Sequence, residues 1–302
     1  MIVVFGSINI DQVYQMTALP VGGETVLADG YIQVPGGKGA NQALAARRAG
    51  ADVHMAGCVG ADANADPALA LLRNDGVGLD AVVATDRPTG CASIWVAADA
   101  ENSIVVSSGA NKAAISEQVP QDFLNKKDIL LLQMEIPAQE NWRLLARARA
   151  EGMTTLLNLA PASDLPKSAL HDLDYLIVNE GEAARVAAQY GLQHLKPVDL
   201  AARLSADYDL CCVLTLGPSG AVAVKDGDLL SVDAFAVEAV DTTAAGDSFI
   251  GAFAAALDDG SSLHTALEYA SATAALACMG MGAQSSIPYQ KSVLGFLAHQ
   301  TK

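Results

Sequence analysis

Positive charge is scarce in this sequence. Its 302 residues include 18 lysines and arginines against 34 aspartates and glutamates, which gives a formal net charge of -16 at pH 7. A surface of that sign repels both the phosphate backbone of nucleic acids and anionic lipid headgroups. The composition therefore excludes nucleic acid and membrane surfaces as main partners.

Cysteine is also scarce, and long apolar runs are missing. The five cysteines form no C-x-x-C pair, which predicts reduced thiols rather than a disulfide framework or a zinc site. The alanine-rich stretch after Asp259 is interrupted by His264 and Glu268, so it falls short of the roughly 20 apolar residues of a membrane span. Met1 leads directly into an apolar run without the basic flank of a secretory signal. We expect a cytoplasmic protein.

What is present is an alternation of short apolar runs with longer helical patterns, without a linker, a repeat or a low-complexity tract. Strands are predicted at residues 2–7, 128–136, 154–159, 175–178 and 211–216, and helices at 38–49 and 138–150. Nearly continuous apolar strands are typical of parallel sheets that helices cover on both faces. The sequence predicts a doubly wound, mostly parallel α/β fold over a single domain, residues 1–302.

Two segments, residues 12–34 and 89–108, interrupt this alternation with strand-like patterns and no helix. Antiparallel strands inserted between parallel units indicate a small sheet that stands off the main one. We expect these segments to form a β lid.

The strongest local signal is residues 241–247, Asp-Thr-Thr-Ala-Ala-Gly-Asp, followed by a helical run at 248–257. At a helix N-terminus the backbone N–H groups of Ala245, Gly246 and Asp247 are open to an anion such as a phosphate. The Asp247 carboxylate could then accept a proton from an attacking hydroxyl. Equally, Asp241 or Asp247 could simply cap the helix.

Residues 35–42, Pro-Gly-Gly-Lys-Gly-Ala-Asn-Gln, also lead into a helix, but they match neither a Walker A loop nor a dinucleotide fingerprint. Gly36 and Gly37 would let a ligand with many hydroxyls approach the backbone, and Asn41 offers it both a donor and an acceptor. The alternative is a tight glycine turn with Lys38 in solvent.

Polar residues also follow the predicted strands, where ligands bind in open α/β sheets. Asn9 and Asp11 share one face if the chain stays extended, although turn capping explains such residues as well. Further polar groups stand at 133–135, at 158 and at 179–182, where acidic residues favour the helix dipole whatever the function. Residues 215–220 form a loop of the kind that can lie along nucleotide phosphates.

In their order and spacing these motifs resemble the ribokinase (PfkB) family of sugar and nucleoside kinases. The resemblance rests on residues 6–11, 36–42, 57–62, 109–111, 133–135, 158–162, 179–182, 215–220, 241–247 and 282–286. It implies a lid that closes on the sugar, a homodimer formed through that lid, and transfer of phosphate from ATP, with Mg²⁺, to a primary hydroxyl. D-ribose, giving D-ribose 5-phosphate, is the expected substrate; fructose, deoxyribose and nucleosides are the alternatives.

The resemblance also implies roles for individual residues. Asp247 is similar to the family's catalytic base, with Gly246 and Ala245 in the anion hole. The sugar-binding positions match Asn9, Asp11, Gly36, Gly37, Lys38, Asn41, Glu135 and Asp247. The nucleotide-binding positions match Asn179, Thr215, Gly217, Gly220, Ala245, Gly246 and Ser271. Glu182 matches a position associated with Mg²⁺, and a K⁺ site matches Asp241, Thr243, Ala277, Gly282 and Ser286. The family often has a larger polar residue at Ser271 and an arginine at Gly280.

Two other classes of protein compete with this interpretation. A dinucleotide-dependent oxidoreductase on a Rossmann sheet would carry G-x-G-x-x-G after the first strand, where this chain has Gly6-Ser7-Ile8-Asn9-Ile10-Asp11. A non-catalytic sugar sensor would have no need of Asp247 and an intact anion loop. The sequence therefore favours the kinase.

Overall fold

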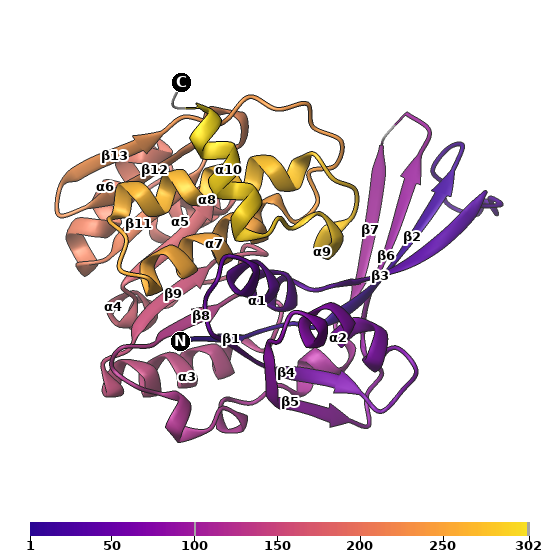
Figure 1. Ribbon diagram of the computed structural model, residues 1–302, viewed down its shortest axis with the longest axis horizontal. Coiled ribbons are helices and arrows are strands. Elements are labelled where there is room, and N and C mark those ends of the chain that lie inside the picture. Colours follow the sequence, from indigo (N-terminus) through magenta and orange to yellow (C-terminus); the bar gives the residue numbers. More distant parts are fainter. Residues whose placement is uncertain (100, 301–302) are drawn as a thin grey trace.

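A computed structural model of the chain describes residues 1–99 and 101–300. Its main sheet has the strand order β13-β12-β11-β10-β9-β8-β1-β4-β5 and is parallel except for β12 and β13 (Figure 1). The strands of this sheet are β1 (Ile2–Phe5), β4 (Val53–Gly60), β5 (Gly78–Thr85), β8 (Ile129–Leu132), β9 (Thr154–Asn158), β10 (Tyr175–Asn179), β11 (Cys211–Thr215), β12 (Ala221–Lys225) and β13 (Asp228–Val232).

Helices cover both faces of this sheet, because apolar side chains leave the buried strands in both directions. In β1, Ile2 and Val4 enter one core while Val3 and Phe5 enter the other. One face is covered by α1 (Lys38–Arg48), α2 (Ala65–Asn74), α7 (Ala245–Asp258) and α8 (Leu263–Cys278). The other is covered by α3 (Ala138–Glu151), α4 (Lys167–Asp172), α5 (Glu180–Tyr190) and α6 (Pro197–Tyr208). The predicted doubly wound α/β fold is confirmed.

Shorter helices and one terminal helix complete the chain. They are α9 (Ala283–Ser286), α10 (Gln290–Gln300) and the 3₁₀ helices at Gly109–Ala113, Ser116–Gln118, Gln121–Phe123 and Gly217–Ser219. Within the described residues, no helix is long and apolar enough to cross a bilayer.

The sheet differs from the sequence-based expectation in several places. The strand predicted at 128–136 ends at Leu132, because the chain turns there and the Met134 N–H donates to the Ala160 carbonyl at 3.0 Å. The parallel strands β4 and β5 were not predicted, and neither was the antiparallel hairpin of β12 and β13. Its two strands extend the β11 edge.

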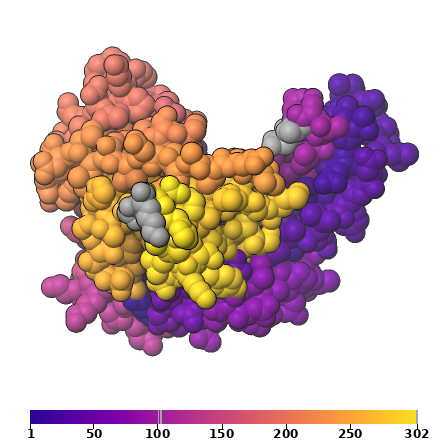
Figure 2. Space-filling view, turned by 45° about the horizontal axis from the view of Figure 1, so that its top comes forward, coloured from indigo at the N-terminus to yellow at the C-terminus, as the bar shows by residue number. Residues whose placement is uncertain are grey.

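A second, small sheet has the order β3-β2-β6-β7 and projects from the main body (Figure 1). Its strands are β2 (Asn9–Met16), β3 (Gly30–Gly36), β6 (Gly90–Ala97) and β7 (Asn102–Ser107). The central pair, β2 and β6, is parallel rather than antiparallel as expected, since these strands follow β1 and β5, which run in one direction. Ala100, in the second predicted lid segment, lies outside the described residues. Figure 2 shows a hollow between the small sheet and the orange part of the main body.

Two polar side chains tie the base of the small sheet to the main body. Asn111 accepts from the Ile8 N–H at 2.9 Å and donates to Asn9 Oδ1 at 2.7 Å. The Asp62 carboxylate accepts from the Thr89 N–H at 2.8 Å and from its hydroxyl at 2.7 Å. The points where β2 and β6 leave the body are therefore held by hydrogen bonds.

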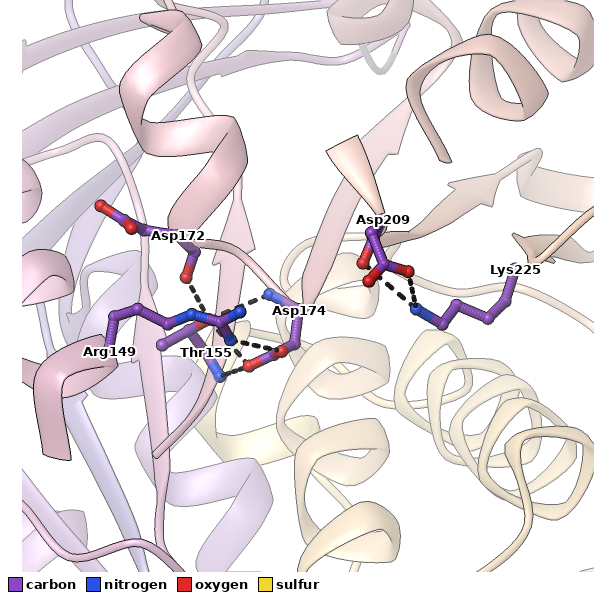
Figure 3. Close-up of polar contacts among 6 residues, drawn as sticks. All are labelled: Arg149, Thr155, Asp172, Asp174, Asp209 and Lys225. Carbon is purple, nitrogen blue, oxygen red and sulfur yellow. Dashed lines mark hydrogen bonds and ion pairs between the residues drawn. The ribbon is translucent and has the colours of Figure 1, made fainter. Parts of the chain in front are cut away.

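The opposite edge of the main sheet, at the amino ends of β9, β10 and β11, is fastened by charged side chains (Figure 3). The Asp174 carboxylate accepts from the Thr155 N–H at 2.8 Å and pairs with Arg149 at 3.0 Å. Lys225 pairs with Asp209 at 3.2 Å, which joins the end of β12 to the turn between α6 and β11. The candidate functional site lies at the other edge, where the carboxyl ends of the parallel strands meet.

Candidate functional site

Asp247 lies in the first turn of α7, buried at the carboxyl edge of the main sheet, with 7% of its surface exposed. Its Oδ2 accepts from Asn41 Nδ2 at 2.9 Å, and its Oδ1 accepts from Gln42 Nε2 at 2.9 Å. The N-cap of α7 is Ala244, and no side chain caps this helix within the described residues. The alternative in which Asp247 merely caps the helix is therefore wrong.

The start of α7 presents fewer open N–H groups than the sequence predicts. The Ala245 N–H donates to the Thr242 carbonyl at 3.2 Å, because Ala244 adopts a left-handed conformation, with φ of 59°, and tightens the turn. The N–H groups of Gly246 and Asp247 have no acceptor among the residues that the structure describes. These two groups are therefore available to an anion.

Asn9 and Asp11 stand at the start of β2, both buried, beside the glycine pair before α1. A Cβ on Gly36 would lie 2.1 Å from Asp11 Oδ2, so only glycine fits against this carboxylate. Burial, together with the negative charges of Glu135 and Asp247, raises the pKa of Asp11 to about 7. Its Oδ1 is buried without a partner among the described residues, and a ligand hydroxyl would satisfy it.

Lys38 follows Gly37, whose φ of 91° favours glycine, and begins α1. The residue is half-buried and borders a cavity beside Asp247, whose charge raises the pKa of the Lys38 ammonium group against the opposing effect of burial, with smaller contributions from Glu135 and Glu182. The alternative that places Lys38 in solvent is therefore wrong. Lys38 is the cation among the carboxylates of the site.

Glu135 reaches the same site from the turn after β8. Its Oε2 accepts from the Ser7 hydroxyl at 2.5 Å and from the Lys38 N–H at 3.1 Å. Glu135 therefore also stabilises the start of α1, where a negative charge is favourable. Sequence reasoning missed Ser7, although it stands inside a motif that was noted, because nothing local indicates a contact 128 residues away.

On the other side of Asp247 a cavity of about 240 Å³ opens over the carboxyl ends of β9, β10 and β11. Its lining residues are Lys38, Asn158, Ala160, Ile177, Asn179, Glu182, Thr215, Thr242, Ala244, Gly246, Asp247 and Ile250. Of the predicted nucleotide positions, Gly217, Gly220, Ala245 and Ser271 are not part of this lining. Close packing by itself requires glycine at position 220, since a Cβ there would lie 2.0 Å from the Val232 carbonyl oxygen.

Asn179 and Glu182 form a capping box at the start of α5. The Glu182 N–H donates to Asn179 Oδ1 at 2.9 Å, and Glu182 Oε2 accepts from the Asn179 N–H at 2.8 Å. Burial raises the pKa of Glu182, against the effects of the Asn179 hydrogen bond and of Lys38. The predicted favourable placement of acidic residues at this helix start is confirmed, and the Glu182 carboxylate also borders the cavity.

Asp241 joins the segment before α7 to the loop before α9. Its Oδ1 accepts from the Thr243 N–H at 2.8 Å and its Oδ2 from the Gly282 N–H at 2.9 Å. Burial raises the pKa of Asp241, but these hydrogen bonds outweigh it and leave the pKa lowered. The Ala277 carbonyl accepts from the Gly280 N–H, and the Ser286 hydroxyl donates within α9. The predicted cation residues are thus gathered around one pair of loops.

Carboxylate, hydroxyl and carbonyl oxygens are present in these two loops and in the cavity lining. Carboxylates and carbonyls suit hard cations such as Mg²⁺ and K⁺. Within residues 1–99 and 101–300, no three His, Cys, Asp or Glu side chains are grouped as an all-protein metal site requires. A Mg²⁺ ion held by one or two carboxylates and by substrate phosphates fits the Glu182 side of the cavity.

Known proteins resemble this chain over nearly its whole length. The model of the pfkB family carbohydrate kinases matches residues 1–290. A ribokinase of Schizosaccharomyces pombe is 39% identical over 300 residues, which cover 95% of this chain and 94% of that protein. A ribokinase structure from Thermotoga maritima superposes with a TM-score of 0.92 at 33% identity, covering 98% of this chain and 99% of that one. A structure of Arabidopsis thaliana ribokinase complexed with ribose and ATP gives a TM-score of 0.87 at 32% identity, covering 98% of both chains. The chain belongs to the pfkB family of carbohydrate kinases.

Proposed function

We propose that this protein transfers the γ-phosphoryl group of ATP to the primary hydroxyl of D-ribose and forms D-ribose 5-phosphate. The observation that carries the proposal is the position of Asp247. Its carboxylate lies between the buried polar groups at the base of the small sheet and the cavity at the carboxyl edge, at the start of a helix. The relative from Arabidopsis thaliana, described as complexed with ribose and ATP, supports the choice of both substrates.

In this proposal Asp247 accepts the proton of the sugar hydroxyl as that oxygen attacks phosphorus. The N–H groups of Gly246 and Asp247 stabilise the charge on the transferring phosphoryl group. Ala245 donates no hydrogen bond to that group and contributes to the anion hole only by placing the backbone of the two residues that follow it. Lys38 adds a positive charge beside the reacting atoms. Catalysis then consists mostly of positioning and electrostatics.

The sugar is assigned to the polar groups around the glycine pair. They are the buried Asn9, Asp11 and Asn41 and the half-buried Lys38 and Glu135, with Gly36 and Gly37 allowing close approach of the backbone. Several hydrogen-bonding groups suit a ligand with several free hydroxyls, because a buried polar group left unpaired costs about 1–3 kcal/mol. Deoxyribose is disfavoured for this reason, and fructose and nucleosides remain the competitors to be tested.

The nucleotide is assigned to the cavity lined by Asn179 and Thr215 and to the neighbouring residues Gly217, Gly220 and Ser271. Glu182 would hold Mg²⁺ there together with the phosphates of ATP. When bound, this ion neutralises phosphate charge. Glu182 is oriented for that role by its hydrogen bond from the Asn179 N–H.

K⁺ is assigned to the loops joined by Asp241, with Thr243, Ala277, Gly282 and Ser286 as the residues that would hold it. When bound, it supplies a positive charge beside the backbone that leads into α7. Asp241 already fixes both loops through the N–H groups of Thr243 and Gly282. The ion is therefore proposed to act by ordering the anion site rather than on the reacting atoms.

We further propose that residues 1–302 form one kinase domain, that the small sheet is its lid, and that two chains associate through this sheet. Tyr31, Ile32, Ile104, Val105 and Val106 are large apolar side chains exposed on the edge strands β3 and β7. Exposed apolar edge strands are typical of association sites. Light scattering should give the mass of a dimer, and Ile32→Lys should reduce it to that of a monomer; an unchanged mass would contradict the proposal.

A cytoplasmic location is proposed as well. All five cysteines lie within the described residues and are free, and Cys58, Cys211 and Cys212 are buried. Free thiols suit a reducing compartment. Fractionation of cells that contain the protein would test this, with recovery from an oxidising compartment as the contrary result.

The activity is tested by coupled ADP release over pentoses, hexoses and nucleosides, with wild type and Asp247→Asn compared. Turnover should be highest with D-ribose, and the variant should lose about 10²- to 10⁴-fold in kcat, which is typical of general-base catalysis. Absence of sugar-dependent ADP release would refute the proposed function. A variant within about threefold of wild type would refute the role of Asp247 alone.

A further inference from the structure

Gln42 is a fully buried amide next to Asn41 in α1, and none of the roles above uses it. Its Nε2 donates to Asp247 Oδ1 at 2.9 Å and to Asn158 Oδ1 at 3.1 Å. Both hydrogens of this amide are therefore directed at oxygen atoms. Rotating the amide by half a turn would place Oε1 against a carboxylate, so its orientation is determined.

The contact between Gln42 and Asp247 depends on a close approach of two helices. Gly251, one turn after Asp247 in α7, lies directly on α1: a Cβ there would be 2.4 Å from the Gln42 carbonyl oxygen and 2.6 Å from the Ala45 Cβ. Asn158 holds the amide from the other side and donates to the Ile177 carbonyl at 3.4 Å. Gln42 thus connects α7 to the carboxyl edge of the main sheet.

The two carboxylate oxygens of Asp247 accept hydrogen bonds from the side-chain amides of two different residues. Oδ2 accepts from Asn41, which is assigned to the sugar and whose own Oδ1 is buried without a partner among the described residues. Oδ1 accepts from Gln42, whose second hydrogen is directed at Asn158. Gln42 Oε1 is likewise buried without a partner among the described residues, so the two amides differ in their N–H contacts: Gln42 Nε2 donates to two oxygens, and Asn41 Nδ2 donates to Asp247.

We propose that Gln42 is a positioning residue for Asp247: it fixes Oδ1, and thereby presents Oδ2 as the oxygen that accepts the sugar's proton. The inference rests on the proposed function, since it takes Asp247 as the base. The proton passes from the sugar hydroxyl to Oδ2, while the hydroxyl oxygen forms its bond to phosphorus and the bond to the leaving ADP oxygen breaks. Gln42 touches neither sugar nor nucleotide in this scheme.

The test compares wild type, Gln42→Met, Asp247→Asn and the double variant. Methionine keeps the length and volume of glutamine but cannot donate a hydrogen bond. Gln42→Met should lower kcat with D-ribose by about 10- to 100-fold, as a displaced catalytic group does. The dissociation constants for ribose and ATP, measured by calorimetry, should change by less than about threefold, because Gln42 contacts neither ligand in the scheme.

The double variant distinguishes positioning from a structural effect. If Gln42 acts through Asp247, adding Gln42→Met to Asp247→Asn should lower kcat no further than about twofold, since residues that act as a unit are not additive. Multiplied losses would overturn the proposal, and so would a single variant with kcat within about threefold of wild type. Gln133→Met is the matched control, because Gln133 is also fully buried but its side-chain amide has no hydrogen-bond partner among the described residues.

Two further outcomes are separable. Should Gln42→Met lose its cooperative thermal transition, Gln42→Leu replaces it; this variant also lacks the amide and should lower kcat in the Asp247 background but not in the Asp247→Asn background. Equal losses in both backgrounds would overturn the proposal. Absence of sugar turnover in wild type refutes the proposed function and this inference with it, whereas normal turnover of Gln42→Met beside an inactive Asp247→Asn refutes the inference alone.

Discussion

The Arg48→Met substitution removes a buried guanidinium that joins three parts of the fold. Nε of Arg48 pairs with Asp75 Oδ2 at 2.6 Å, and its Nη1 donates to the carbonyls of Gln284 and Ile287, both at 2.8 Å. The guanidinium carbon lies 4.7 Å from the centroid of the Tyr289 ring. One side chain therefore fastens the end of α1 to α9, next to the proposed K⁺ loops, and to the turn after α2.

The expected loss follows from what the substitution leaves behind. The Asp75 carboxylate keeps only the Tyr289 hydroxyl, at 3.1 Å, among these partners. Breaking a buried ion pair by removing one member destabilises a protein by about 3–5 kcal/mol. With about 2.1 cal/mol/K of unfolding entropy per residue over 302 residues, that loss lowers the melting temperature by about 5–8 °C.

Thermal melts followed by circular dichroism measure this difference, with Arg73→Met as the control. Arg73 pairs with Asp66, but both side chains are more than half exposed, so its loss should cost no more than about 0.5 kcal/mol. Adding Asp75→Asn to Arg48→Met should restore part of the stability, because the uncompensated charge disappears. Equal melting temperatures for the Arg48 and Arg73 variants would refute the reasoning.

Three other predictions follow from the site. Asn41→Ala should weaken ribose binding about 5- to 150-fold, the equivalent of about 1–3 kcal/mol, and leave ATP binding unchanged; equal calorimetric losses for both ligands would mean that the sugar site is misplaced. The pKa of Asp11, raised to about 7 by burial and by Glu135 and Asp247, means that the folded state keeps a proton that the unfolded state releases near pH 4. Stability should therefore be greatest below about pH 4 for this group and fall as pH rises to about 7, and Asp11→Asn should remove that fall in urea titrations; an identical slope in both proteins contradicts it. KCl should raise the melting temperature and kcat above the values in tetramethylammonium chloride at equal ionic strength, and Asp241→Ala should abolish both effects; equal values in the two salts for wild type would exclude the K⁺ site.

Much of the fold follows from local patterns. The apolar runs that became β9, β10 and β11 are buried on both faces, and the strand ends predicted there lie within one residue of the observed ones. The strand β13 was missed because Asp228–Val232 is largely exposed and lacks a continuous apolar run. The strand β12 was missed although four of its five residues are apolar and buried, so a short apolar run did not by itself identify every strand of the main sheet.

The site was predictable only in part, because its contacts join distant residues. Asn41 and Asp247 were noted separately, and the carboxyl edge of a parallel sheet explains why they meet. The pairing of Gln42 with Asp247 depends on the crossing of α1 and α7 at Gly251, which no local pattern reveals. The available signal was weak: a glutamine next to Asn41 in a helix whose other buried positions, apart from Asn41 and Arg48, are small or apolar.

The base of the small sheet has a mechanical consequence. Four chain crossings join the sheet to the body, and each is only a few residues long, between β1 and β2, β3 and α1, β5 and β6, and β7 and Gly109. A sheet held by four short connections cannot swing freely like a tethered domain. Any change in its angle to the main body must therefore occur at its base. The base lies at Asn9 and Gly36, beside the proposed sugar site. A small rotation of the sheet there would move the far ends of β3 and β7 over a larger distance.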